Sequence, residues 1–287
     1  MEVRKYCFAG LEMQLSTEGD LLDRDQDNLS VFAVENVKDP HCFEIQKVEN
    51  FQAPSQEYVT MQSTFRVYRD DSREIRYIGS VSQDWKSAYI RAVHDGKEHL
   101  VQFKAEIIKD KIGTHSILEA LAAEHLIVQN GGLILHCSYI ACDGKAILFT
   151  APSGTGKSTQ ADLWNQHRCA EIINGDRAAL RFINGVLSAE GIPYSGSSKY
   201  CKNRTLPVQA IVYLSKAPET SIKRLSGYQA FLKVWEGTSV NTWNKDDVDK
   251  ASELVQRIVE RTPIFHLSCT PDESAVLTLQ KALEGVV

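Results

Sequence analysis

The chain has 287 residues, of which 43% are hydrophobic and 24% are charged. These proportions are typical of globular proteins and exclude wholesale disorder and fibrous repeats. Lys and Arg number 32 against 37 Asp and Glu, so the formal net charge is −5, and no long basic run occurs. A mildly acidic chain of this kind is a poor candidate for binding duplex nucleic acid. The length allows one large domain or two ordinary ones, at about 100–200 residues per domain.

Signals for targeting and for redox chemistry are weak in this sequence. No stretch approaches about 18 uninterrupted apolar residues, so we expect no segment that spans a bilayer. The first residues, Met-Glu-Val-Arg-Lys-Tyr, lack the apolar core of a signal peptide. Seven cysteines are spread along the chain without a C-x-x-C pair, which argues against a zinc knuckle and a thioredoxin-type site. The sequence therefore predicts a cytoplasmic protein with free thiols and no membrane partner.

The first hundred residues have the composition of antiparallel β structure. Residues 58–68 are rich in β-branched and aromatic side chains, and a polar break separates them from residues 74–78, which predicts a hairpin. Residues 87–93 alternate in polarity, and an Asp-Gly turn leads to residues 99–103, which predicts a second hairpin. The charges are typical of the solvated faces of half-buried strands, and no catalytic cluster is visible. We predict a smaller, β-rich domain over residues 1–112.

The hydrophobic period changes near residue 112. Apolar residues recur at helical spacing from residue 117 to residue 128, and Asn-Gly-Gly follows at residues 130–132, which predicts one helix with its C-terminal cap. Strands and helices alternate beyond it, so we predict an α/β domain over residues 113–287. The predicted strands are 133–140, 146–150, 171–173, 179–183, 186–189, 209–214 and 264–267, and the predicted helices are 158–166, 228–234, 247–261 and 272–284.

Residues 146–159 carry the strongest motif of the chain. Their sequence, Ala-Ile-Leu-Phe-Thr-Ala-Pro-Ser-Gly-Thr-Gly-Lys-Ser-Thr, departs from the P-loop pattern G-x-x-x-x-G-K-[ST] at Ala151, where the first glycine is usual. The segment lies between an apolar strand and a helix, where backbone N–H groups and the helix N-terminus bind phosphate. The alternative is a turn that only caps a helix. The residues predicted to bind the nucleotide are Ser153, Gly154, Thr155, Gly156, Lys157, Ser158 and Thr159.

Two further residues are expected beside this loop. His136 lies on the strand that precedes the P-loop strand, and the turn between the two strands would bring it next to the loop. Asp176 follows an apolar strand, as expected of a carboxylate that orders Mg²⁺ or accepts a hydroxyl proton. Taken alone, His136 could be an ordinary buried histidine of a strand, and Asp176 could be an ordinary turn residue. Together they predict a catalytic site in which Lys157 contacts phosphates and Ser158 and Asp176 bind magnesium.

These motifs resemble the HPr kinase/phosphorylase family, which shares a catalytic core with ATP-dependent phosphoenolpyruvate carboxykinase. The resemblance covers residues 130–215 and is carried by Gly-x-Leu-x-x-His, the Asp-Gly turn, Ser-Gly-Thr-Gly-Lys-Ser-Thr and a strand that ends in an acid. The layout is similar to that of the kinases of lasso-peptide clusters, which phosphorylate a serine of a precursor peptide. The resemblance implies an α/β P-loop kinase core of this type, preceded by a smaller β-rich N-terminal domain.

The resemblance also implies roles for single residues. It implies that Lys157 contacts the phosphates, that Ser158 binds magnesium, and that His136 lies near the phosphate that is transferred. Asp176 matches one acid of the family's Asp-Asp pair, whereas Gly175 stands where the other is expected. Glu190 falls roughly where these kinases place another acid, so it is the candidate helper, the alternative being a surface glutamate. Residues 191–204 are rich in glycine and serine and carry three cations, Lys199, Lys202 and Arg204. This loop either closes over the phosphates or is an ordinary solvated loop.

The expected function is an ATP- and magnesium-dependent kinase that phosphorylates a hydroxyl, most plausibly a serine of a peptide or small protein. The β-rich domain would then bind the peptide, by adding a substrate strand to an open sheet edge. One alternative is a nucleotide-binding module that has lost catalysis. The other is a carboxykinase-like enzyme that acts on a small acid. The phosphate acceptor, the choice between ATP and GTP, and a homo-oligomeric state are left open.

Overall fold

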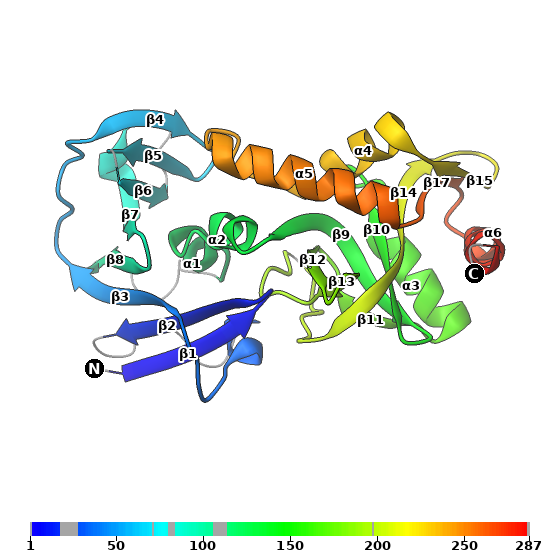
Figure 1. The fold of residues 1–287 in the computed structure, drawn as a ribbon, viewed down its shortest axis with the longest axis horizontal. Helices are drawn as coiled ribbons and strands as arrows, with labels where there is room; N and C mark the ends of the chain where they lie inside the picture. Colours follow the sequence, from blue (N-terminus) through cyan, green and yellow to red (C-terminus); the bar gives the residue numbers. More distant parts are fainter. Residues whose placement is uncertain are drawn as a thin grey trace. The chain divides into compact units, whose positions relative to one another are not determined.

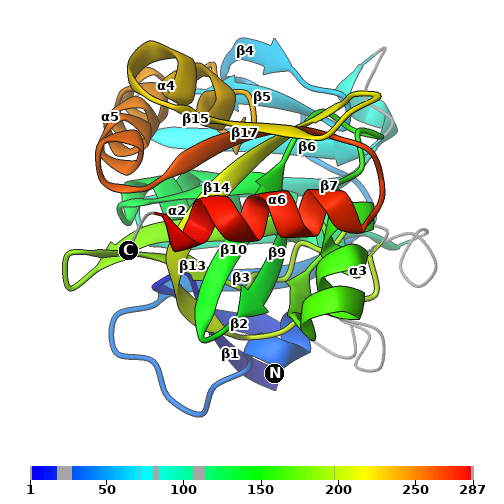
Figure 2. The ribbon, with the colours of Figure 1, turned by 90° about the vertical axis from the view of Figure 1, so that its right-hand side faces the viewer.

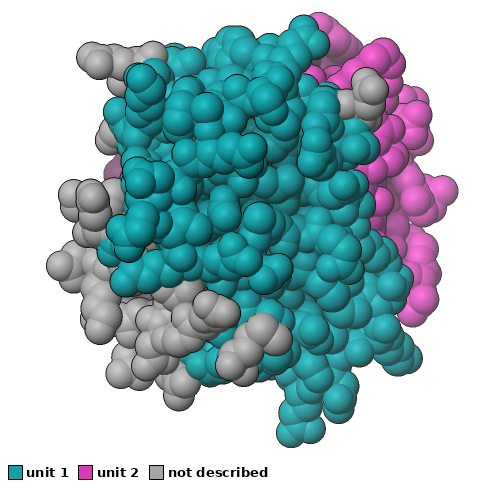
Figure 3. All heavy atoms as spheres, turned by 90° about the vertical axis from the view of Figure 1, so that its left-hand side faces the viewer, with its two compact units in different colours: residues 1–126 teal, residues 127–287 magenta. Residues whose placement is uncertain are grey.

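The computed structural model describes residues 2–17, 28–70, 72–79, 84–105, 114–196 and 198–285. The chain divides into two compact units, residues 1–126 and residues 127–287, which Figure 3 draws in different colours. The predicted domain boundary at residues 112 and 113 lies outside the described residues, as does Asp71, the middle residue of the predicted polar break at residues 70–72. No helix in the described part of the chain is long and apolar enough to cross a membrane. The protein is a mixed α/β molecule with two large sheets.

The first unit contains an eight-stranded sheet, in the order β1-β2-β3-β8-β7-β6-β5-β4 (Figure 1). β3 pairs in parallel with β2 and β8, and the other neighbours are antiparallel. The elements of the sheet and its short 3₁₀ helices are β1 (Glu2–Phe8), β2 (Leu11–Thr17), η1 (Asn28–Phe32), β3 (His41–Val48), β4 (Glu57–Met61), β5 (Phe65–Arg69), β6 (Arg73–Gly79), η2 (Trp85–Ser87), β7 (Ala88–Asp95) and β8 (Glu98–Lys104).

The hairpins of this sheet confirm part of the sequence prediction and correct another part. The hairpin of β7 and β8 is confirmed, and Gly96 in its turn has φ +57°. The predicted hairpin between residues 58–68 and residues 74–78 is confirmed for β5 and β6, but residues 58–68 do not form one strand, because the chain turns back between β4 and β5. The backbone N–H of Gln62 donates to the carbonyl of Phe65 at 2.8 Å and closes that turn. The polar residues Gln62, Ser63 and Thr64 supply the turn within an otherwise strand-like composition.

A buried polar network lies in the first unit. The guanidinium of Arg76 is fully buried and pairs with Glu74 at 2.8 Å and with Glu124 at 2.6 Å. The two carboxylates outweigh burial and raise the pKa of Arg76, so the guanidinium stays charged. On the neighbouring strands His99 hydrogen-bonds to His94 at 3.1 Å and to His41 at 3.0 Å. These residues alternate with apolar ones, so the sequence pattern did not separate them from solvated positions.

The helical segment after residue 113 is broken, which corrects the prediction of one continuous helix. The structure has α1 (Thr114–Ala120) and α2 (Ala123–Gln129). Ala122 adopts φ 50°, in the left-handed region, so regular helix cannot continue through it. Its N–H donates to the carbonyl of Glu119 at 3.2 Å, a tightened last turn. The apolar spacing continues across the break, which is why the pattern predicts a single helix.

The second unit is built on a nine-stranded sheet in which β10 has two partners. β10 pairs antiparallel with β9 and parallel with β14, and the path β9-β12-β13-β14 joins the same two strands on the other side. These five strands therefore form a closed circuit. The strands are β9 (Gly132–Cys142), β10 (Lys145–Thr150), β11 (Glu171–Asn174), β12 (Arg177–Ile183), β13 (Val186–Glu190), β14 (Thr205–Lys216), β15 (Ser221–Leu225), β16 (Thr238–Ser239) and β17 (Ile264–Cys269).

Helices cover both faces of β10 because its side chains alternate between two cores. Ala146 and Leu148 join one cluster, and Ile147 and Phe149 join the other. The first cluster includes residues of α4 (Gly227–Trp235) and α5 (Lys245–Arg261), and the second includes residues of α3 (Lys157–Arg168) and α6 (Glu273–Glu284). Figure 2 shows α6 passing in front of β10, with α3 to its right. The four helices predicted beyond residue 150 are confirmed, whereas β15 and the short β16 were not predicted.

Candidate active site

The loop between β10 and α3 carries the glycine-rich segment in which the sequence predicts nucleotide binding. Gly154 and Gly156 have φ 74° and 124°, values that favour glycine. Gly156 is the N-cap of α3 and supplies no side-chain cap, so the first N–H groups of this helix remain available to an anion. Ala151 occupies the position of the missing glycine, is buried, and packs in the core of the α3 side. The departure from the pattern is therefore accommodated by core packing.

Lys157 folds back over this loop. Its Nζ donates to the carbonyl oxygen of Ala151 at 3.0 Å, and the side chain is buried. Burial lowers the pKa of Lys157, and the nearby carboxylate of Asp176 opposes that effect. The ammonium group is therefore partly desolvated, and the negative charge of a phosphate bound there would compensate for the lost contacts with water.

A cavity of about 500 Å³ brings most of the predicted site residues together. Its wall combines the loop and the first turns of α3 with His136 of β9, Asp176, and part of the segment between β13 and β14. Thr155 and Glu190 do not line it. The predicted residues that do are His136, Ser153, Gly154, Gly156, Lys157, Ser158, Thr159 and Asp176.

His136 and Asp176 form a pair because β9 and β12 are neighbours. His136 lies opposite Arg177 in the antiparallel register, which brings it next to the preceding Asp176. Nε2 of His136 is 3.4 Å from Oδ1 of Asp176, and Nε of Arg177 donates to Oδ2 at 3.2 Å. The hydrogen bond from His136 and the charge of Arg177 lower the pKa of Asp176 against the effect of burial. The carboxylate is therefore ionised at neutral pH and can accept a proton or bind a cation.

Asn174 is a residue of this site that the sequence analysis missed. It is fully buried at the end of β11, and its Oδ1 accepts from the backbone N–H groups of Asp176 at 2.9 Å and Arg177 at 3.0 Å. Its Nδ2 donates to the carbonyls of Ile192 at 3.1 Å and Tyr194 at 2.8 Å. Asn174 thus fixes both the turn that carries Asp176 and the start of the next loop. The Asn-Gly-Asp sequence at the end of an apolar strand was an available signal for such a turn.

The structure gives a physical reason for glycine at position 175. A Cβ atom placed on Gly175 would lie 2.2 Å from Oγ of Ser198. An aspartate at this position is therefore incompatible with the observed place of Ser198. A Cβ atom on Gly196 would likewise lie 2.8 Å from Cγ of Asp176. The loop that follows β13 approaches the Asp176 turn so closely that both contact positions require glycine.

The remaining predicted charges lie away from the cavity, with one exception. The carboxylate of Glu190 is buried and accepts two hydrogen bonds from Arg181, at 2.9 and 3.3 Å. Among the loop cations, Lys199 lines the cavity. The other two, Lys202 and Arg204, pair with the carboxylate of Glu171 at 2.8 and 2.9 Å.

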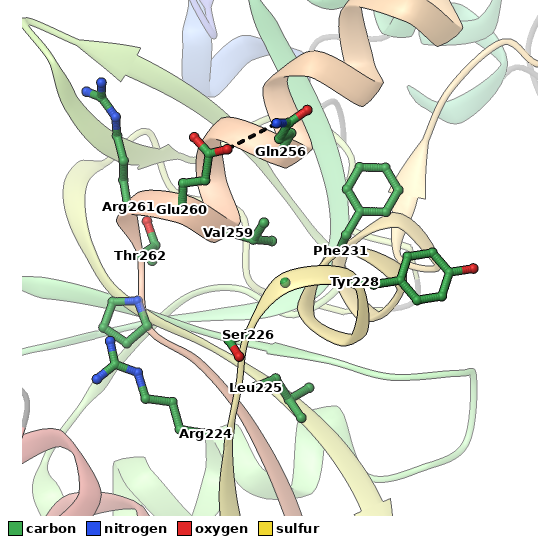
Figure 4. A pocket seen from close by; sticks show the side chains of 12 residues that line it. Arg224, Leu225, Ser226, Tyr228, Phe231, Gln256, Val259, Glu260, Arg261 and Thr262 are labelled. Atoms are coloured by element: carbon green, nitrogen blue, oxygen red, sulfur yellow. Dashed lines mark hydrogen bonds between the residues drawn. The ribbon is translucent and has the colours of Figure 1, made fainter.

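A larger cavity of about 810 Å³ lies elsewhere in the second unit, and none of the predicted site residues lines it. Figure 4 shows its wall, formed by the end of β15, the start of α4, and the last turns of α5 with the residues that follow them. Gln256 donates to Glu260 at 3.1 Å across one turn of α5. The cavity has neither a histidine nor a strand-end carboxylate, so the smaller cavity is the candidate active site.

Comparison with known proteins gives a family. The protein is a mixed α/β protein, and its candidate site cavity is lined by a glycine-rich strand–loop–helix segment and by the His136–Asp176 pair. Residues 106–271, more than half of the chain, match the family model described as SynChlorMet cassette protein ScmC, and the chain belongs to this family. No curated protein sequence matches it.

One solved structure gives a weaker similarity, described as "Structure of the Hpr(Ser) kinase/phosphatase from Coxiella burnetii". The two chains are 11% identical, the match covers 53% of this chain and 93% of the other, and the TM-score is 0.32. A TM-score of this size does not establish a shared fold or a shared activity.

Proposed function

We propose that this protein is a magnesium-dependent phosphotransferase that moves the γ-phosphoryl group of ATP to a serine hydroxyl of a peptide or small protein. The observation that carries the proposal is the convergence of Lys157, Ser158 and the His136–Asp176 pair on one cavity. A phosphoryl transferase needs chiefly positioning and electrostatic stabilisation of the phosphates, together with a group that orients the attacking hydroxyl. These residue types supply each of those needs.

The residues present fit a nucleotide with its metal ion. The first turn of α3 and the left-handed glycines of the loop offer backbone N–H groups, and the partly desolvated Lys157 offers a cation. The hydroxyl of Ser158 and the ionised carboxylate of Asp176 are oxygen ligands of the kind that Mg²⁺ prefers. Magnesium bound there would neutralise negative charge on the phosphates.

In this proposal the side chains of the cavity divide the remaining work. Asp176 orients the acceptor hydroxyl and takes its proton, and the contacts from His136 and Arg177 keep the carboxylate in place. Its lowered pKa makes it a weak base, which suits a transfer in which the proton leaves late. Lys157 stays on the phosphates during transfer. Glu190 as a helper acid, peptide binding by the β-rich part, and a cytoplasmic location remain sequence predictions.

The proposal is tested with the purified full chain, magnesium, γ-labelled ATP or GTP, and a library of serine-containing peptides. We expect label on library peptides, and Asp176→Asn to lower the rate of transfer by about 10²–10⁴-fold, the usual contribution of a positioned acid or base. Asp143→Asn changes an aspartate in the exposed turn between β9 and β10 and should keep the wild-type rate. Transfer that is equally fast in Asp176→Asn would refute the assignment.

A second candidate function is a nucleotide-binding module without transfer. Ser198 fills the space in which a second acid would stand beside Asp176, which favours this alternative. The same experiment separates the two functions. Nucleotide binding without label on any peptide, and without label on the chain itself, supports the module.

A further inference from the structure

The segment between β13 and β14 is held over the candidate active site at both of its ends. At its start, Asn174 donates to the carbonyls of Ile192 and Tyr194. At its end, the N–H of Lys202 donates to the carbonyl of Ile173 at 3.1 Å. Both anchors belong to β11, the strand that leads to Asp176. Four described residues between these anchors line the cavity, namely Ser195, Ser198, Lys199 and Tyr200.

Ser198 is held close to the acid of this cavity. Its Oγ lies against Gly175, the residue that precedes Asp176, with no side chain between them. Gly196, two residues before Ser198, approaches the carboxyl group of Asp176 so closely that a Cβ atom on it would lie 2.8 Å from Cγ. The Ser198 hydroxyl accepts a hydrogen bond from the N–H of Tyr200 at 3.1 Å. That bond uses a lone pair of Oγ, so the hydroxyl proton can be donated to another acceptor.

We propose that Ser198 is a site of autophosphorylation in cis. The proposal rests on the phosphotransferase function proposed above. A hydroxyl group fixed in the cavity that holds the motif lysine and the carboxylate has a far higher effective concentration than a serine of a free peptide. The chain therefore carries its own acceptor beside the site of transfer.

The chemistry of this step balances. A bond forms between Oγ of Ser198 and the γ-phosphorus of ATP, and the bond from that phosphorus to the β–γ bridging oxygen breaks. ADP leaves with the electron pair, and the hydroxyl proton passes to the carboxylate of Asp176 and then to solvent. The products are phosphoserine at position 198, ADP and a proton, and no further reactant is needed.

The test uses the full-length chain with magnesium and γ-labelled ATP, without peptide. Label on the chain is quantified and located by digestion with trypsin and tandem mass spectrometry. We expect label at Ser198, at a first-order rate that does not change with protein concentration. Ser198→Ala and Lys157→Ala should both lose that label. Ser188→Ala should retain it, because Ser188 lies in the same expected tryptic peptide but does not line the cavity.

The outcomes separate this inference from the proposed function. If the wild-type chain binds ATP and labels added peptides but leaves Ser198 unmodified, the inference is overturned and the proposed function stands. Label at Ser198 whose rate constant rises in proportion to protein concentration also overturns it, because the transfer is then between chains. A wild-type chain that binds no ATP refutes both.

Discussion

Replacement of Asn174 tests the architecture of the candidate site most sharply. In Asn174→Ala, the N–H groups of Asp176 and Arg177 lose their acceptor, and the carbonyls of Ile192 and Tyr194 lose a donor. Leaving a buried polar group unpaired costs about 1–3 kcal/mol, so the two N–H groups alone, at the low end of that range, give about 2 kcal/mol. That is a large fraction of the roughly 5–15 kcal/mol that holds a typical domain folded.

A milder variant, Asn174→Asp, gives the prediction a pH dependence. The introduced carboxyl keeps the acceptor for the two N–H groups, but it faces two carbonyl oxygens in place of the amide donor. Burial and those oxygens favour the protonated form and raise the pKa of the introduced group above the roughly 3.9 of an unfolded aspartate. The folded variant then binds the extra proton. Its stability relative to the wild type is therefore greatest in acid and is lost as the pH rises through the raised pKa.

The assay is urea unfolding of the wild type and the two variants at about pH 5 and about pH 8, followed by far-UV circular dichroism and tryptophan fluorescence. Asn165→Ala is the matched control, because Asn165 makes one side-chain bond, to the carbonyl of Ala170 at 2.8 Å, and should cost about 1 kcal/mol. A loss in Asn174→Ala no larger than in this control would refute the reasoning. An equal deficit of Asn174→Asp at both pH values would refute the electrostatic part.

Three further predictions concern other parts of the molecule. Burial lowers the pKa of His99 to about 3, so the folded protein keeps this histidine neutral, whereas the unfolded chain takes up a proton below about pH 6.5. The free energy of unfolding should therefore fall by about 2 kcal/mol between pH 7 and pH 5. Urea unfolding curves should show this loss, and His99→Gln should make the free energy of unfolding less dependent on pH. Gly196→Ala places a methyl group against Asp176 at a residue with left-handed backbone, so the rate of phosphoryl transfer should fall at least about tenfold. A wild-type rate in a kinetic assay would mean that the loop moves away freely. Glu190→Gln should lower the free energy of unfolding by about 1 kcal/mol, because Glu190 pairs with Arg181. The rate of phosphoryl transfer should be unchanged. A reaction that is about a hundredfold slower would instead show that Glu190 is a catalytic acid.

Local patterns predicted the elements that carry the candidate site. The glycine-rich segment before Lys157 needs left-handed backbone and a helix start, and both are local requirements that residues 151–158 satisfy by themselves. The same holds for α5, whose apolar stripe of Ala251, Val255 and Ile258 follows the helical period. The place of His136 beside the loop was also predictable, because the Asp-Gly turn joins β9 to β10, whereas its contact with Asp176 depends on the register of β9 with β12, which that turn does not set.

Features set by long-range packing could not be predicted from the same patterns. The left-handed residue Ala122 breaks a helix without any glycine or proline to mark it. Glu190 has the spacing of a functional acid, but Arg181, on the strand opposite, binds its carboxylate. The Asn-Gly-Asp sequence signals a turn, but the hydrogen bonds of Asn174 to the loop beginning at Ile192 are seen only in the fold. The contacts of Glu190 and Asn174 depend on which strand or loop packs beside them, and spacing along the chain does not show this.

Equilibrium binding of ATP with magnesium, measured by titration calorimetry, tests the central claim most directly. Lys157→Ala removes the cation of the candidate site, and Lys145→Ala removes an exposed lysine at the other end of β10 as a matched control. We predict saturable binding to the wild type and to Lys145→Ala, and binding at least about tenfold weaker, or about 1.4 kcal/mol, in Lys157→Ala. Equal affinity in all three proteins, or no binding to the wild type, would contradict the account.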